Sequence, residues 1–243
     1  MTTPQNAPTI LMIAGHWLGA WAWDEVSACL DALGHRAVPL TLPGLDSDDP
    51  DRSGRTLDEQ AAAIEAALAA DAAGKLPVVV AHSGANLPVS LVLDRNPQAV
   101  GHVVWVDSGP VAPGSVLAPN LPEEVAAVPL PPFDVLGARA SLEGLDAAAL
   151  ARFRARAVPQ PAAVVRTPVD LANDARHDVP TTLVCCSISV EQVLELANSG
   201  HPMFSEVSRL SQVDMIDLPT GHWPMWSRPA DLARVIADVA SGA

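Results

Sequence analysis

The sequence is poor in cysteine and has no long apolar run. Three cysteines, Cys29, Cys185 and Cys186, occur among 243 residues, an odd number without metal-ligand spacing. This pattern argues against a disulfide framework and a zinc site, and it favours a reducing cytoplasm. No apolar run reaches the roughly 18 to 20 residues of a membrane-spanning helix, and no Lys or Arg precedes the first apolar stretch. We therefore expect neither a membrane anchor nor a signal peptide.

Basic residues are also scarce. Lys and Arg number 14 against 28 Asp and Glu, which gives a net charge of −14. A protein that binds the phosphate backbone of nucleic acids needs a basic face, and so does one that binds an anionic membrane. The composition therefore argues against both kinds of partner. Tyrosine is absent and phenylalanine occurs three times, which leaves the oligomeric state undetermined.

The order of apolar segments indicates an α/β fold. The length fits one larger domain or two small ones, and 49% hydrophobic residues allow a sizeable core. Short apolar runs alternate with segments of helical periodicity, which favours βαβ units around a mainly parallel sheet flanked by helices. The expected strands are residues 9–14, 35–42, 77–81, 103–106, 181–186 and 213–218. The expected helices are residues 23–33, 56–73, 190–197, 203–210 and 229–240, with one more ending at 93.

A Pro-rich segment interrupts this alternation. Many of the 23 prolines lie between residues 110 and 178, where strand and helix no longer alternate. We interpret residues 110–178 as an insertion, and residues 1–109 and 179–243 as the core. Within the insertion, helical spacing predicts a helix over residues 145–157 and a second one over about 169–175.

One short motif points to a catalytic serine. Ala81-His82-Ser83-Gly84-Ala85 matches the nucleophile elbow G-x-S-x-G with alanine at both small positions. It lies between an expected buried strand and an expected helix, where such an elbow exposes its serine in a strained turn. The alternative is a serine that only caps the helix. We predict that Ser83 is a nucleophile.

A nucleophilic serine needs a base and an oxyanion site. The base is expected on a loop after a late strand, and His222, which follows residues 213–218, is the histidine in that position. The backbone N–H groups of Gly84 and His16 are the expected donors to the oxyanion. The side chain of His16 could face the pocket or be exposed.

Several ordered motifs together carry a family resemblance. They are Gly15-His-Trp-Leu-Gly-Ala-Trp-Ala-Trp-Asp-Glu-Val26, Leu33-Gly-His35, Leu42-Pro-Gly44, the elbow and Gly221-His222. This set resembles the α/β-hydrolase superfamily, and within it the group of plant hydroxynitrile lyases, methyl esterases and bacterial esterase relatives. The resemblance implies the α/β-hydrolase fold, with a doubly wound sheet and a small cap inserted after the sixth strand, where the Pro-rich segment falls. It also implies Ser83 as nucleophile and His222 as base.

The acidic member of the site is less clear from the sequence. The family's usual acid follows the strand at 181–186, but Ser187-Ile-Ser189 contains no carboxylate. Asp107, at the end of the preceding expected strand, is our preferred acid. Glu191 and a dyad without an acid are the alternatives. The family's His-Gly at the start of the oxyanion loop is replaced here by Ala14-Gly15, which removes a side chain that commonly supports that loop.

These residues predict a serine hydrolase. Ser83, His222 and Asp107 would cleave a small hydrophobic carboxylic ester or lactone through an acyl-enzyme, without cofactor or metal. Trp17 and Trp223 would line an apolar pocket, unless they only pack in the core. One alternative is a lyase of the hydroxynitrile type that uses the same residues for acid and base chemistry. Another is an inactive fold that binds a ligand.

Overall fold

A six-stranded parallel sheet forms the centre of the molecule. The structure is a computed structural model that describes residues 7–70 and 74–242. The strand order is β2-β1-β3-β4-β7-β8, and every neighbouring pair is parallel. The strands are β1 Ile10–Ile13, β2 Ala37–Leu40, β3 Val78–His82, β4 His102–Val106, β7 Thr181–Cys185 and β8 Val213–Asp217. This confirms the mainly parallel α/β fold expected from the sequence.

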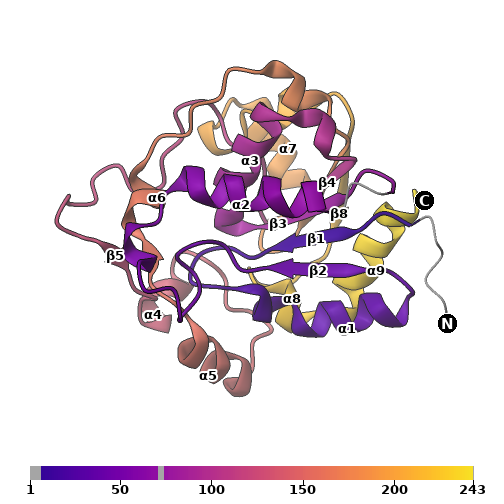
Figure 1. Cartoon of the computed structure of the whole chain (residues 1–243). Coiled ribbons are helices and arrows are strands. Elements are labelled where there is room, and N and C mark those ends of the chain that lie inside the picture. The colour runs from indigo at the N-terminus through magenta and orange to yellow at the C-terminus, as the bar shows by residue number, and fades with distance from the viewer. Residues whose placement is uncertain (1–6, 71–73, 243) are drawn as a thin grey trace.

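Helices cover both faces of the sheet. Figure 1 shows α1 and α9 together on one face of the sheet and α2 and α3 together on the other. Within each pair the two helices are in contact. The helices of this core are α1 Asp24–Ala32, α2 Leu57–Ala70, α3 Asn86–Arg95, α7 Val190–Asn198, α8 Pro224–Ser227 and α9 Pro229–Ser241. A sheet covered on both sides has no polar face, which explains why β1 is apolar throughout and why β3 and β4 are apolar apart from one terminal histidine each.

Alternation along β1 explains how one strand serves two cores. Successive side chains of a strand point to opposite faces. Ile10 and Met12 join the hydrophobic cluster under α1 and α9, whereas Leu11 and Ile13 join the cluster under α2 and α3. All four are buried. The apolar run therefore holds the two helical layers to the same sheet.

Most predicted elements are present, with two corrections. No helix covers residues 169–175; a short 3-10 turn at Asp174–Asp178 follows an irregular stretch instead. The predicted helix at 203–210 is replaced by two 3-10 turns, Pro202–Phe204 and Val207–Arg209. Residues 71–73 of the predicted second helix lie outside the described residues. Apolar residues at helical spacing were insufficient in both places, because segments this short make too few backbone hydrogen bonds to hold a helix without further packing.

The segment between β4 and β7 carries its own small elements beside the carboxyl ends of the strands (Figure 1). We call residues 110–178 the intervening segment. It follows β4, the fourth strand in chain order, rather than a sixth. Its elements are β5 Ala127–Val128, α4 Phe133–Gly137, α5 Ala147–Arg156, β6 Gln160–Pro161 and α6 Ala162–Arg166. Of these, only α5 matches a prediction from the sequence.

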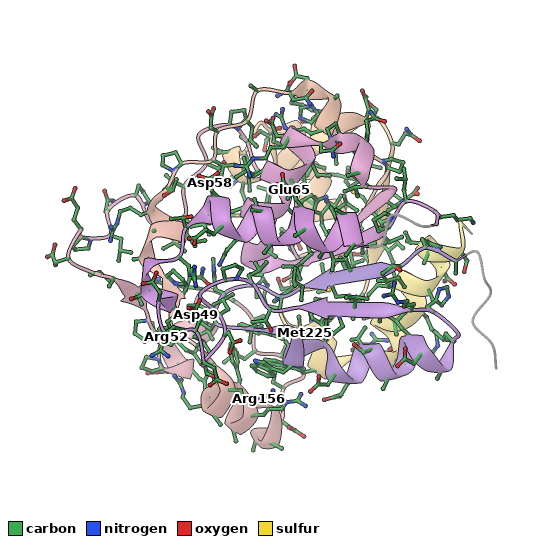
Figure 2. The ribbon with its side chains drawn as sticks, in the orientation of Figure 1. Asp49, Arg52, Asp58, Glu65, Arg156 and Met225 are labelled. Atoms are coloured by element: carbon green, nitrogen blue, oxygen red, sulfur yellow. The ribbon has the colours of Figure 1, made fainter. Side chains whose placement is uncertain are left out.

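Two arginines of α5 attach the intervening segment to the core, and a third binds within the segment. Arg152 pairs with Glu25 of α1 at 2.8 Å. Arg156, labelled in Figure 2, lies 3.7 Å from a carboxylate oxygen of Asp24, and its guanidinium stacks over Trp21. The contacts of Arg152 and Arg156 hold α5 next to the core. Arg154 donates to the backbone carbonyls of residues 130 and 131, within the intervening segment itself. Within the described part of the chain, no helix is both long and apolar enough to cross a membrane.

Candidate active site

The candidate site lies where the sheet changes its winding direction. β1 has β2 on one side and β3 on the other, so the crevice at the carboxyl ends of β1 and β3 is the topological switch point. Ser83 begins the 3-10 turn that joins β3 to α3. Its φ is 52°, in the left-handed region that side chains rarely adopt. This turn is the strained strand-to-helix elbow that the sequence motif predicts.

His222 contacts Ser83 from the loop after β8. The hydroxyl of Ser83 donates to Nε2 of His222 at 2.8 Å. The backbone N–H of His222 donates to the carbonyl of Ser141 in the intervening segment at 2.7 Å. A Cβ added to Gly221 would lie 2.6 Å from that same carbonyl oxygen, so the loop can approach the intervening segment this closely only with glycine there. The intervening segment thus helps to fix the backbone of His222.

Asp107 is the carboxylate that contacts His222. Nδ1–H of His222 donates to Oδ2 of Asp107 at 2.5 Å. The other carboxylate oxygen accepts the backbone N–H groups of Cys186 at 3.0 Å and Ser187 at 2.8 Å. The Ser187 hydroxyl donates to Oδ2 at 2.6 Å. Burial alone would raise the pKa of Asp107, but the bond and charge of His222 and the bonds from Ser187 hold it below its ordinary value.

The geometry distinguishes between the acids that the sequence left open. Glu191 is exposed in the first turn of α7, and no hydrogen bond joins it to His222 in the described structure. Where the family pattern places its acid, this chain has Ser187, which instead holds Asp107. Sequence reasoning missed this role of Ser187. The available signal was a hydroxyl residue directly after a buried strand that neighbours the strand of Asp107.

His82, within the elbow, links two parts of the site. Gly15 N–H donates to Nδ1 of His82 at 3.3 Å, which leaves the ring proton on Nε2. That Nε2–H donates to the backbone carbonyl of His222 at 2.8 Å. Burial lowers the pKa of His82 to about 3, so the ring is neutral at pH 7. The loop after β1 has Ala14 where the family pattern has a histidine. In this chain the ring of His82 contacts that loop instead, through its bond from Gly15 N–H.

Glycines allow the loop after β1 to approach the elbow. A Cβ on Gly15 would lie 2.7 Å from the Cβ of Ser83 and 3.1 Å from the amide nitrogen of Gly84. Gly84 is in the first turn of a helical segment, where amide groups have no intrahelical acceptor. The approach brings the backbone N–H groups of His16 and Gly84 to the same end of the sheet. Their role as oxyanion donors stays a prediction.

The side chain of His16 faces the site, which the sequence left undecided. A Cβ on Gly84 would lie 2.3 Å from Nε2 of His16, so the imidazole occupies the space beside that glycine. Burial lowers the pKa of His16 to about 4. The side chain of Gln160 opposes this shift and the charge of His222 adds to it. His16 is therefore a neutral imidazole at pH 7, next to the residue that follows Ser83.

The two tryptophans predicted to line the pocket lie at different depths. Trp17 is partly exposed, has a φ of 66°, and meets the ring of His16 edge-on with 5.7 Å between ring centres. Trp223 is only 2% exposed and contacts the ring of His222 edge-on at 4.9 Å. Trp223 thus holds the His222 ring from the core side and offers little surface to a ligand. Their role as pocket walls stays a prediction.

The thiols of the two adjacent cysteines make no hydrogen bond to Ser83, His222 or Asp107 in the described structure, although the backbone of Cys186 binds Asp107. Cys185 ends β7, Cys186 follows it, and both are buried. Burial raises the pKa of the Cys185 thiol to about 12, so it carries no nucleophilic thiolate at pH 7. In residues 7–70 and 74–242, no group of three or more His, Cys, Asp or Glu side chains could hold a metal ion.

Comparison with curated proteins finds plant esterases. Esterase PIR7B of Oryza sativa subsp. japonica is 35% identical over 98 residues, which are 40% of this chain and 37% of the rice protein. Methylesterase 2 of Arabidopsis thaliana is 25% identical over 155 residues, which are 63% of this chain and 58% of that protein. The chain thus spans between about two fifths and three fifths of the length of these relatives.

Solved structures match over almost the whole chain. An extracellular alpha/beta-hydrolase from a Paenibacillus species has a TM-score of 0.75 and 19% identity, and the match covers 95% of this chain and 98% of that one. A pyrethroid hydrolase from Sphingobium faniae has a TM-score of 0.67 and 18% identity, covering 96% and 97%. At such identities the likeness shows the shared fold. The sequence model of the alpha/beta hydrolase family matches residues 10–235, and the chain therefore belongs to this family.

Proposed function

We propose that this protein is a serine hydrolase that cleaves a small, hydrophobic carboxylic ester or lactone through an acyl-enzyme. The observation that carries the proposal is the continuous hydrogen-bonded chain from Ser83 through His222 to Asp107. A nucleophile, a base and an orienting carboxylate in this order are the parts that acyl transfer needs. The esterase names of the curated relatives support the same reaction class.

The reaction follows from the donors and acceptors in this chain. His222 takes the hydroxyl proton of Ser83 at Nε2 while Oγ attacks the carbonyl carbon of the ester. Negative charge on the carbonyl oxygen is held by the N–H groups of His16 and Gly84. His222 returns the proton to the leaving alcohol, which leaves an acyl group on Ser83. His222 then takes a proton from a water molecule that attacks the acyl carbon, and it returns that proton to Oγ of Ser83 as the acid leaves. Throughout, Asp107 keeps the ring proton of His222 on Nδ1.

The substrate is expected to be uncharged. With a net charge of −14, the protein repels anionic substrates at long range. The proposed site adjoins neutral imidazole and indole groups, which favours hydrophobic and uncharged polar groups. We also propose that the intervening segment, residues 110–178, is the cap of this site and that residues 1–109 and 179–243 form the core. Its contacts with the loops of Trp17 and His222 support that division.

A lyase reaction at the same residues is less well supported. Such a reaction commonly depends on a cationic side chain that holds the leaving anion. The arginines of α5 are the cations that the sequence offers nearby. Arg152 and Arg156 pair with acidic residues of α1, and Arg154 binds backbone carbonyls and stacks over Phe133. These contacts occupy the three guanidinium groups, so we favour ester hydrolysis.

The test is the release of p-nitrophenol from p-nitrophenyl acetate and butyrate. The wild type is compared with Ser83→Ala and His222→Ala after circular dichroism shows that all three are folded. We expect turnover by the wild type, its loss in both variants, and an acyl adduct on Ser83 by intact mass. An inert wild type or a fully active Ser83→Ala would overturn the acyl-enzyme mechanism.

A second measurement separates an enzyme from an inactive binding module. A fluorophosphonate probe reacts covalently with an activated serine. We expect labelling of the wild type and none of Ser83→Ala. Because the probe needs no knowledge of the true substrate, absence of labelling in the folded wild type would contradict the hydrolase proposal even if the ester substrates were badly chosen.

A further inference from the structure

The side chains of His16 and Gln160 form a polar pair beside the nucleophile that the mechanism above does not use. Acyl transfer uses only the backbone N–H of His16. Its imidazole lies against Gly84, where a Cβ would come within 2.3 Å of Nε2 and 2.4 Å of Cε1. The ring therefore borders the space next to Ser83, and the glycine at position 84 makes that position possible.

Gln160 comes to this ring from the intervening segment. It lies in β6, opposite Val128 of β5, and is only 2% exposed. Two hydrogen bonds tie these strands to the loop that carries His16. The indole N–H of Trp17 donates to the carbonyl of Val128 at 3.0 Å, and the backbone N–H of Val158 donates to the carbonyl of Trp17 at 3.0 Å. The position of Gln160 relative to the His16 ring is therefore fixed by backbone contacts on both sides.

The amide oxygen of Gln160 can accept more hydrogen bonds than the described structure supplies. Oε1 is buried and reaches no donor at full hydrogen-bond geometry. Its interaction with the His16 ring, which opposes the burial-driven lowering of the His16 pKa, uses at most one of its two lone pairs. Buried polar atoms of native proteins are nearly always hydrogen-bonded, and an unpaired one is costly. An acceptor held in this way next to a proposed active site fits a ligand group that brings its own donor. Both side chains are uncharged at pH 7 and offer no countercharge to an ionic group, so a hydroxyl or an amide N–H is the donor that suits them.

We infer that Gln160 and His16 form a subsite for a hydroxyl or N–H group that the substrate carries near its ester carbonyl. The inference rests on the ester hydrolysis proposed above and narrows its substrate class to hydroxy or amido esters. A site built to bind a hydroxyl discriminates strongly against the analogue that lacks it, because the polar groups of the site are then left unpaired. A purely apolar pocket would show no such preference.

Two matched pairs of esters test the inference on either side of the ester bond. On the acyl side, methyl mandelate is compared with methyl phenylacetate. On the alcohol side, 2-hydroxyethyl phenylacetate is compared with n-propyl phenylacetate. Acid release at pH 7.5 gives kcat/KM for each ester, and each ratio is divided by the ratio of the alkaline hydrolysis rates, which removes intrinsic reactivity. The enzymes are the wild type, Gln160→Met, His16→Phe and the control Gln60→Met, which changes another buried glutamine, in α2.

We expect the wild type to prefer the hydroxyl ester of at least one pair by about tenfold or more. Gln160→Met and His16→Phe are expected to bring that ratio close to one, while Gln60→Met keeps the wild-type ratio. Hydrolysis without preference in either pair, or a preference that persists in both site variants, would overturn the inference and leave the esterase proposal standing. If the folded wild type hydrolyses none of these esters and no p-nitrophenyl ester, the esterase proposal fails and the subsite falls with it.

Discussion

Replacing Asp107 with asparagine reverses the hydrogen-bonding direction at the side chain that holds His222. The carboxylate accepts four hydrogen bonds, from the backbone N–H groups of Cys186 and Ser187, from the Ser187 hydroxyl and from Nδ1–H of His222. The oxygen of the replacement amide can still accept the backbone N–H groups of Cys186 and Ser187. The amide NH₂ group then takes the place of Oδ2 and faces His222. His222 must then accept at Nδ1 and carry its proton on Nε2. In that tautomer it cannot take the proton of Ser83.

The expected loss follows from this wrong tautomer. Serine hydrolases with a carboxylate changed to its amide lose activity by about 10³- to 10⁴-fold, equivalent to about 4 to 5.5 kcal/mol of transition-state stabilisation. We expect a loss of this size in kcat for Asp107→Asn, with p-nitrophenyl butyrate as substrate. The size of the side chain is nearly unchanged, so circular dichroism and the thermal midpoint serve to show that the protein remains folded.

Glu191→Gln is the matched control. It makes the same chemical change at the other carboxylate that the sequence allows, but on an exposed position of α7 without a bond to His222. We expect its activity to stay within about twofold of the wild type, because exposed substitutions away from a site have small effects. The reasoning is refuted if Asp107→Asn keeps more than a tenth of the activity, or if Glu191→Gln is the variant that loses it.

Three further predictions follow from other contacts. Gly15→Ala places a Cβ 3.0 Å from the backbone oxygen of His82 and 2.7 Å from the Cβ of Ser83, so we expect lost activity and a cost of about 2 kcal/mol or more in urea unfolding. Gly74→Ala, which has no atom within 4 Å, should behave as wild type. Burial lowers the pKa of His82 from 6.5 to about 3 and that of His16 to about 4, so below pH 6.5 the unfolded chain binds more protons than the folded one. Each of the two groups should then lower stability by up to about 1.4 kcal/mol per pH unit between pH 6.5 and pH 4, and equal urea midpoints at pH 7 and pH 5 would contradict this. The raised pKa of Cys185 predicts negligible alkylation by iodoacetamide in the native protein at pH 7.5 and full alkylation in urea, and rapid native labelling of this thiol by peptide mass would show the prediction to be wrong.

Local pattern was sufficient for the fold class and for two residues of the candidate site. The apolar runs at β1, β3 and β4 are buried on both faces, which is what a parallel sheet between two helical layers requires. Ser83 could be located because an elbow is a local structure, a strand, a tight turn and a helix within about a dozen residues. His222 could be located because it follows a recognisable late strand. In such cases the signal and the structure span the same short stretch of chain.

The sequence failed where helical spacing was the only evidence. Residues 169–175 and 203–210 have apolar residues at suitable intervals, yet they form irregular backbone and 3-10 turns. The antiparallel pairing of β5 and β6 was not predicted, because each strand has only two residues and α4 and α5 lie between them in the chain. Elements this short are stabilised by tertiary contacts such as the indole of Trp17 on Val128, and these contacts leave no periodic pattern.

The sequence by itself determined the parallel α/β core, the elbow at Ser83 and the loop position of His222, since each depends on residues that are neighbours in the chain. Only the tertiary structure decided that Asp107 rather than Glu191 meets His222, which lies 115 residues away. It also decided that the neutral ring of His82 supports the loop 67 residues before it, and that Gln160 faces His16. The physical reason is that hydrogen bonds between strand ends depend on which strands are adjacent in the sheet and on how the backbone turns after each one. Both are set by the packing of the whole core.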